Sequence, residues 1–281
     1  MELKYVDAHC HLQFDDYDAD SDALIARMRE ESVAGIVVGV DLESSKKALA
    51  LAEKHEHLYA SVGLHPNRVA GKIFNIEEYR KLAENPKVIA IGECGLDYYR
   101  PAEVNEEVKH KQREALLAHI ELAAELDKPL IIHCRPSKGT PRKIPEDEAS
   151  RGKMDTYQDL IQILTEAKIT YPNVRGAVHF FVGGIAEAQE LIALGFTVSF
   201  TAVITFARDY DAVIKSVPLT SILSETDAPY VAPEGRRRKR NDPLAVVEVV
   251  SKIAEIRGEN LDTVRAALLA NARLVFGLPV C

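Results

Sequence analysis

Short apolar segments typical of buried strands alternate with helical patterns along most of this chain. Between the apolar segments, apolar residues recur at three- and four-residue spacing, as amphipathic helices require. Strands that alternate with helices form parallel sheets through right-handed crossovers. The predicted strands are rich in β-branched residues and bounded by Gly, Pro or polar residues; they cover residues 5–11, 35–40, 58–65, 88–97, 129–134, 175–181, 196–200 and 221–230.

Eight such strands in 281 residues predict an α/β fold, a (β/α)₈ TIM barrel, with an open doubly wound sheet as the alternative. No change of composition marks a linker, so we expect residues 1–281 to form a single barrel domain. No apolar run approaches the roughly 20 residues that cross a bilayer, and the N-terminal residues lack the features of a signal peptide. We therefore expect a cytoplasmic protein without membrane contacts, whose cysteines are free thiols.

Histidines and carboxylates cluster at the ends of the predicted strands. In a TIM barrel, catalytic residues lie at the C-terminal mouth, where strands end and βα loops begin. Side chains alternate along a strand, so His9 and His11 point the same way. We therefore expect one polar group at the barrel mouth, drawn from His9, His11, His65, Glu93, Asp97, His133, His179, Glu225 and Asp227.

Imidazole and carboxylate ligands together suit divalent metals such as Zn, Mn or Fe, whereas Mg prefers more oxygen. Taken alone, a His-x-His pair fits a metal site and a pair of core histidines bonded to the backbone equally well. A catalytic zinc takes three protein ligands plus water, so six candidate ligands predict two divalent ions (Zn, Mn or Mg). We assign Glu93 as their bridge. One ion would be held by His9, His11 and Asp227, the other by His133 and His179, and both would be contacted by Glu93.

Six segments occur in the order expected of TatD-type metal-dependent hydrolases, a family of the amidohydrolase superfamily that includes deoxyribonucleases. They read DAHCH, SVGLHP, IGECGLDYY, IIHCR, AVHFF and ETDAPY. The resemblance runs from Asp7 to the NARLVF segment. It implies a (β/α)₈ barrel, a divalent-metal centre held by the six ligands above, and phosphodiesterase action on DNA, often from the 3′ end. The family residue that matches His65 lies near the substrate phosphate.

These observations predict a phosphodiester hydrolase, a DNase that acts as a 3′–5′ exonuclease on single-stranded DNA or frayed 3′ ends. Two metal ions would activate a water for in-line attack. Asp227 would take the proton, Glu93 would bridge the ions, and His65 would bind the phosphate or protonate the leaving oxygen.

Two alternatives stay open. One is a superfamily relative that hydrolyses a lactone or amide or deaminates a small molecule; such relatives often use a carboxylated lysine where this chain has Glu93. The other is a binding protein without useful catalysis, although all six predicted metal ligands are present.

Two departures from the family pattern bear on substrate choice: Phe180 replaces the usual Cys, and segment 136–153 is longer than expected.

Charge suggests how DNA would bind. A net charge of -8 does not suit a protein that coats duplex DNA. Arg135 is a candidate fork for phosphate, or equally a salt bridge that closes its loop. Two basic loops would ring the pocket and funnel a single strand into it. They contain Arg236, Arg237 and Arg238 within 235–240, and Lys138, Arg142, Lys143, Arg151 and Lys153.

Several neighbouring residues have predicted supporting roles. We expect Glu225 to contact a ligand histidine, and Asp97 either to do the same or to cap a turn. Cys10, Cys94 and Cys134 should face away from the ligands, into the layer between barrel and helices. Tyrosines in the loops are candidates for stacking on bases, namely Tyr98, Tyr99 and Tyr230.

Overall fold

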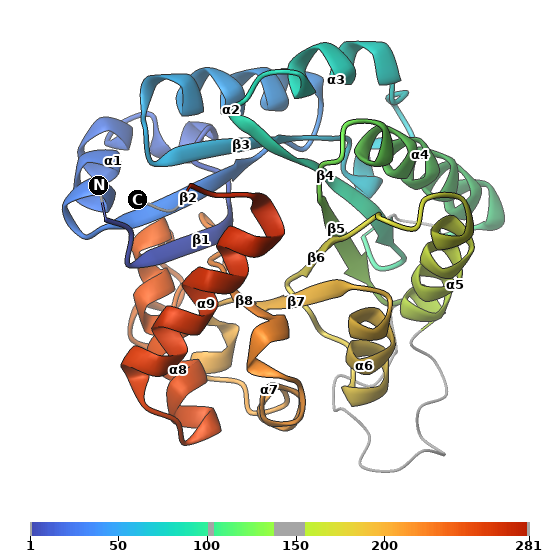
Figure 1. The fold of residues 1–281 in the computed structure, drawn as a ribbon. Helices are drawn as coiled ribbons and strands as arrows, with labels where there is room; N and C mark the ends of the chain where they lie inside the picture. The colour runs from blue at the N-terminus through green and yellow to red at the C-terminus, as the bar shows by residue number, and fades with distance from the viewer. Residues whose placement is uncertain (1, 101–103, 138–154, 280–281) are drawn as a thin grey trace.

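Eight parallel strands form one sheet in chain order, as a computed structural model of the protein shows (Figure 1). The structure describes residues 2–100, 104–137 and 155–279. The strands are β1 (Tyr5–Cys10), β2 (Val33–Val38), β3 (Leu58–Val62), β4 (Val88–Asp97), β5 (Leu130–Arg135), β6 (Gly176–His179), β7 (Phe196–Phe200) and β8 (Ile222–Ser224). The predicted (β/α)₈ barrel is confirmed.

The barrel closes just beyond the end of β8. Cys10 and Ala228 form a parallel bridge. The His11 N–H donates to the Ala228 carbonyl at 2.8 Å, and the Asp227 N–H donates to the His9 carbonyl at 2.9 Å. The seam of the barrel therefore runs through residues that carry candidate ligands.

Helices surround the strands on the outside of the barrel (Figure 1). Side chains of Asn105 and Asn260 accept backbone N–H bonds at the starts of two of them, and Gly258 and Gly277, both with φ of 66°, follow two helix ends. The helices are α1 (Ser21–Glu30), α2 (Leu42–Lys54), α3 (Ile76–Ala83), α4 (Glu106–Glu125), α5 (Asp155–Thr170), α6 (Ile185–Ala193), α7 (Asp211–Ser216), α8 (Val246–Arg257) and α9 (Leu261–Phe276).

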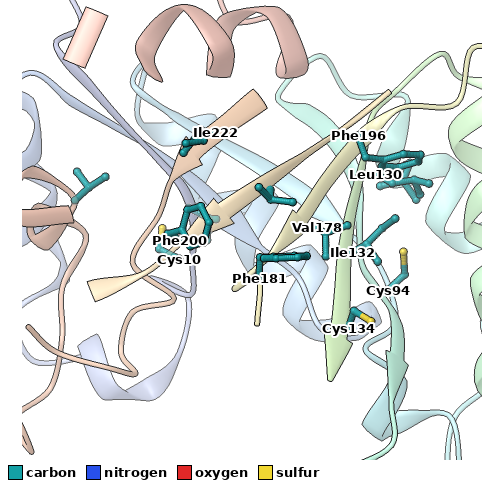
Figure 2. Packing of buried hydrophobic residues seen from close by; sticks show 14 of the residues in the cluster. Cys10, Cys94, Leu130, Ile132, Cys134, Val178, Phe181, Phe196, Phe200 and Ile222 are labelled. Atoms are coloured by element: carbon teal, nitrogen blue, oxygen red, sulfur yellow. The ribbon is translucent and has the colours of Figure 1, made fainter. Parts of the chain in front are cut away.

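The larger hydrophobic core lies between the strands and the helices. Cys10, Cys94 and Cys134 are buried in it, and Val178, Phe181 and Phe200 belong to the same cluster (Figure 2). Burial raises the pKa of all three thiols. The predicted placement of these cysteines away from the ligands is confirmed.

A second core cluster joins inward-facing strand residues to α9. Ile36 and Ile131 belong to it together with Leu269 and Phe276 of α9. The Asn271 amide donates at 2.8 Å to the carbonyl of Ile222, the first residue of β8. Helix α9 therefore covers the N-terminal end of the barrel and leaves the C-terminal mouth for the polar group.

The last predicted strand is too long. Strand β8 ends at Ser224, six residues before the predicted end at Tyr230. Asp227 has φ of 53°, which a strand does not allow. Phe180, with φ of 44°, ends β6 early in the same way.

None of the helices in the described part of the chain combines the length and the apolar composition that a membrane span requires.

Candidate metal centre

The six predicted ligands meet at the C-terminal mouth of the barrel. Five different elements carry them, because β1 supplies His9 and leads into His11, while the others come from β4, β5, β6 and the segment after β8. A cavity of about 1390 Å³ opens at this point. Its lining includes five of the six, namely His11, Glu93, His133, His179 and Asp227.

Glu93 lies at the centre of this group and is only 3% exposed. Its Oε1 lies 2.8 Å from Nε2 of His179 and 3.0 Å from Nδ1 of His133. Its Oε2 lies 3.6 Å from Nε2 of His9 and 4.0 Å from Nε2 of His11. The two oxygens of one carboxylate therefore face two different pairs of histidines.

The first pair stands with Asp227. The Nε2 atoms of His9 and His11 are 3.3 Å apart, and Oδ1 of Asp227 lies 3.5 Å from the second of them. Nδ1 of His11 donates to the Val38 carbonyl at 2.8 Å. This bond leaves Nε2 with its lone pair facing the group, which is the tautomer that a metal ligand needs.

The second pair is backed by further carboxylates. Nδ1 of His133 lies 3.2 Å from Nε2 of His179. The opposite nitrogens face acids, since His133 Nε2 is 3.1 Å from Asp97 Oδ2 and His179 Nδ1 is 3.6 Å from Glu225 Oε1. Carboxylates behind imidazoles orient the rings and increase their basicity. The expected contact between Glu225 and a candidate ligand is present.

Asp97 fills both of its predicted roles. Its Oδ1 accepts the N–H groups of Tyr99 and Arg100, which caps the turn after β4. Its Oδ2 accepts from Asn67 and faces His133. Burial would raise the pKa of Asp97, but these hydrogen bonds hold it well below its usual range.

The donor chemistry of the group fits divalent cations. Burial opposes the charge on Glu93, yet the surrounding histidines hold its pKa well below the usual value, so it is a carboxylate. Burial and the neighbouring His179 lower the pKa of His9, which favours the neutral imidazole that binds metals. Ligand atoms of His9, His11 and Glu93 lie within 4.8 Å of one another, as do those of His65, Glu93 and His133.

His65 lies beside the second pair. Its Nδ1 accepts the Asn67 N–H at 3.0 Å, so its Nε2 carries the proton. That Nε2 is 3.3 Å from Oε1 of Glu93, and the ring lines the cavity. His65 is thus placed to donate a hydrogen bond into the cavity.

Asp7 is a buried carboxyl group that the sequence analysis did not single out. It accepts from the Thr226 N–H at 2.9 Å, the Thr226 hydroxyl at 2.6 Å and the His9 N–H at 3.2 Å. These bonds hold the segment that carries Asp227 against β1. The signal was available, because Asp7 precedes His9 by two positions on the same strand.

Two side chains of α4 hold the strand ends that carry His65 and Asp97. Gln112 accepts the Asp97 N–H at 2.9 Å and donates to the Asp97 carbonyl at 3.0 Å. His119 accepts the Leu64 N–H on Nε2 at 2.9 Å, and its Nδ1 donates to the Ala115 carbonyl. The helical pattern around His119 favours either a surface residue or a satisfied helix residue, and the structure shows the second. Its bond to Leu64 joins α4 to the segment before His65.

This arrangement predicts a pH dependence of stability. Burial lowers the pKa of His119 from 6.5 to about 4, so the folded protein favours the neutral ring. Its contribution to the free energy of unfolding is complete above about pH 6.5 and is lost as the pH falls towards 4. A shift of this size corresponds to roughly 3 kcal/mol. Urea unfolding of wild type and His119→Leu should show a stability gap at pH 7 that shrinks by pH 4.5. A gap independent of pH would contradict the prediction.

Among the described residues, the arginines that line the cavity beside the candidate ligands are Arg68, Arg100 and Arg135. The Arg135 guanidinium lies over the Tyr99 ring, 4.2 Å from its centroid. Arg68 pairs with Asp41 at 2.9 Å, and Lys72 pairs with the same carboxylate. One carboxylate thus serves two cations.

Two arginines of the predicted basic run at 235–240 contact other side chains of the protein. Arg236 pairs with Asp242 at 3.2 Å and with Glu248 at 2.6 Å. Arg237 lies over the ring of Phe206, which itself lines the cavity. The cavity lining does not include Arg236, Arg237 or Arg238, so their contact with phosphate stays a prediction. The second predicted basic loop, Lys138, Arg142, Lys143, Arg151 and Lys153, lies outside the described residues.

The three tyrosines differ in their access to the cavity. Tyr98 is buried and its hydroxyl donates to Asp159 at 2.7 Å, so the expectation that it stacks on bases is wrong. Tyr99 and Tyr230 line the cavity. Tyr230 is 52% exposed and remains a candidate for stacking.

Comparisons with known proteins agree with the geometry. A family model described as TatD related DNase matches residues 6–277. The chain is 31% identical over 274 residues to the uncharacterized metal-dependent hydrolase YabD of Bacillus subtilis, covering 96% of this chain and 98% of that protein. It is 32% identical over 270 residues to the 3′-5′ ssDNA/RNA exonuclease TatD of Erwinia amylovora, covering 92% and 94%. The crystal structure of the TatD homologue YjjV from Escherichia coli superposes with a TM-score of 0.84 at 29% identity, covering 99% and 100%.

Proposed function

The chain belongs to the family of TatD-related DNases, and we propose that it is a divalent-metal-dependent phosphodiesterase that shortens single-stranded DNA from the 3′ end. The observation that carries the proposal is Glu93, whose two oxygens face separate groups of ligand atoms. A similar protein of Erwinia amylovora is named a 3′-5′ ssDNA/RNA exonuclease, which supports the substrate class.

We assign the ligands of two ions to the residues that the fold brings together. His9, His11 and Asp227 would hold one ion, His133 and His179 the other, and Glu93 would contact both. Ions bound there would supply an activated water near neutral pH and offset negative charge on a phosphate. The opposite ring nitrogens of two of these histidines already have hydrogen-bond partners. Nδ1 of His11 bonds to the Val38 carbonyl, and Nε2 of His133 bonds to Asp97.

The chain's own side chains would complete the reaction. Asp227, 13% exposed at its side chain and lining the cavity, would accept the proton of the attacking water. His65, with its proton on Nε2, would donate to a phosphate oxygen or to the leaving oxygen. Arg135, whose guanidinium lies over the Tyr99 ring, would bind a backbone phosphate as a fork.

The direct test uses 3′- and 5′-labelled single-stranded oligonucleotides. Metal-stripped protein would be resupplied with Mg, Mn or Zn, beside a variant that combines His133→Ala with Asp227→Ala. We expect shortening from the 3′ end that requires metal and is absent in the variant. A protein that holds two ions but cleaves neither DNA nor RNA would contradict the proposal and lead to lactone, amide and deamination assays.

Replacing Arg135 by Ala should weaken substrate binding and its dependence on salt. Loss of one phosphate contact to a single strand lowers the slope of log affinity against log salt by roughly 0.7. KM should rise at low salt, and the measurement is KM at several NaCl concentrations. Arg27→Ala, on the outer surface in α1, is the matched control.

The same assay tests the arginine run after β8. Arg236→Ala should have a smaller effect than Arg135→Ala, because Asp242 and Glu248 already neutralise the Arg236 guanidinium. An equal change in the salt slope for both variants would show that the run contacts phosphate as well.

A further inference from the structure

One side of the cavity is apolar, opposite in character to the candidate ligands. It is built after β6 and β7, where a 3₁₀ helix covers Ala202–Thr205. The lining residues there are Phe180, Val182, Val203, Phe206 and Tyr210. A metal centre alone has no use for such a surface, so it points to an apolar part of the ligand.

Phe180 is held in place at the junction between this wall and the candidate ligands. It directly follows His179 and has φ of 44°, a conformation that is uncommon for a residue with a bulky side chain. Its N–H donates to Oε1 of Glu225 at 2.6 Å. The other oxygen, Oε2 of Glu225, accepts from the Ser199 hydroxyl at 2.6 Å. The carboxylate that backs His179 therefore also fixes the backbone of Phe180.

Positive charge lies next to the apolar wall. The Arg237 guanidinium is 4.4 Å from the centroid of the Phe206 ring. Arg100 and Arg135 belong to the lining of the same cavity. The cavity thus offers cations beside aromatic and aliphatic surface. A nucleotide matches this combination, because it joins a flat base to an anionic phosphate; a neutral lactone or amide lacks the anion.

We propose that the wall formed by Phe180, Val182, Val203 and Phe206 is a subsite for a nucleobase next to the scissile phosphate, with Phe180 as its stacking residue. The inference rests on the proposed nuclease function and adds a specificity-determining residue to it. Phe180 is the aromatic residue of this wall that directly follows His179 in the chain. Base–aromatic stacking depends little on base identity, which suits degradation of strands of any sequence.

The test compares oligonucleotides that carry or lack the base at the terminal and at the penultimate 3′ nucleotide. Stacking of one base should favour the base-bearing substrate by roughly tenfold to a hundredfold in kcat/KM. Phe180→Ala should remove this preference, and Phe180→Tyr, which keeps a ring, should retain it. A second readout is the fluorescence of 2-aminopurine at the same positions, which stacking should quench in wild type and not in Phe180→Ala.

The outcomes separate the two proposals. Cleavage that is equally fast with and without the base at both positions overturns the subsite and leaves the nuclease function standing. A preference that persists in Phe180→Ala also overturns it. Absence of cleavage of every oligonucleotide overturns the nuclease function and the subsite with it. A preference that vanishes in the alanine variant and returns with tyrosine supports the subsite.

Discussion

Glu93→Gln is expected to lower kcat/KM for oligonucleotide cleavage by roughly 10³-fold or more, because a metal centre supplies several kcal/mol of transition-state stabilisation. The carboxylate lies between both groups of histidines, 2.8 Å from His179 and 3.6 Å from His9. An amide carries no charge and offers one acceptor oxygen in place of two. The measurement is kcat/KM together with the metal content of the purified protein, which should fall below that of wild type.

The control for this prediction is Glu84→Gln, which changes an exposed glutamate at the end of α3. It should leave both activity and metal content unchanged. Full activity and full metal content in Glu93→Gln would show that Glu93 is not a ligand, and the assignment of a bridge would be withdrawn.

Asp7→Ala is expected to lower the free energy of unfolding by about 3 kcal/mol. The change leaves two N–H groups and one hydroxyl without their acceptor, at roughly 1–3 kcal/mol for each buried group. Removal of a buried carboxyl also removes its desolvation cost, which places the net effect towards the lower end of that sum. Activity should fall as well, because the Thr226 bonds hold the segment that carries Asp227.

Urea unfolding of the metal-free protein measures the stability, so that metal binding does not enter. Asp7→Asn keeps one acceptor oxygen and should lie between wild type and Asp7→Ala. Asp18→Ala, at an exposed aspartate, is the control and should stay within about 0.5 kcal/mol of wild type. Wild-type stability in Asp7→Ala would show that the three hydrogen bonds contribute nothing net.

The sequence predicts most of this fold because its patterns are local. Strands β4 and β7 have the predicted bounds, 88–97 and 196–200. The end of β8 was predicted wrongly because apolar composition does not reveal the positive φ of Asp227. Next to Asp227, Thr226 bonds to Asp7 across the barrel seam, and a linear pattern does not contain such contacts.

The candidate ligands were predictable for a related reason. Parallel strands in a barrel end at one mouth, so polar residues at strand ends converge whatever the loops do. The roles of helix residues were not predictable, because the sequence of α4 does not indicate that His119 accepts a hydrogen bond from the Leu64 N–H. Charge runs are also misleading, because Arg236 is paired with acids that lie six and twelve positions further along the chain.

The seam of the barrel carries a consequence for how the protein reaches its working state. Asp7 and Thr226 are 219 positions apart, and their hydrogen bond closes the barrel beside Asp227. Contacts between such distant positions form late, because a large loop must close before they are gained. During synthesis, Asp227 therefore cannot join His9 and His11 until the segment after β8 has left the ribosome. In a refolding experiment, recovered catalysis should mark the docking of that strand, after most helical signal has returned.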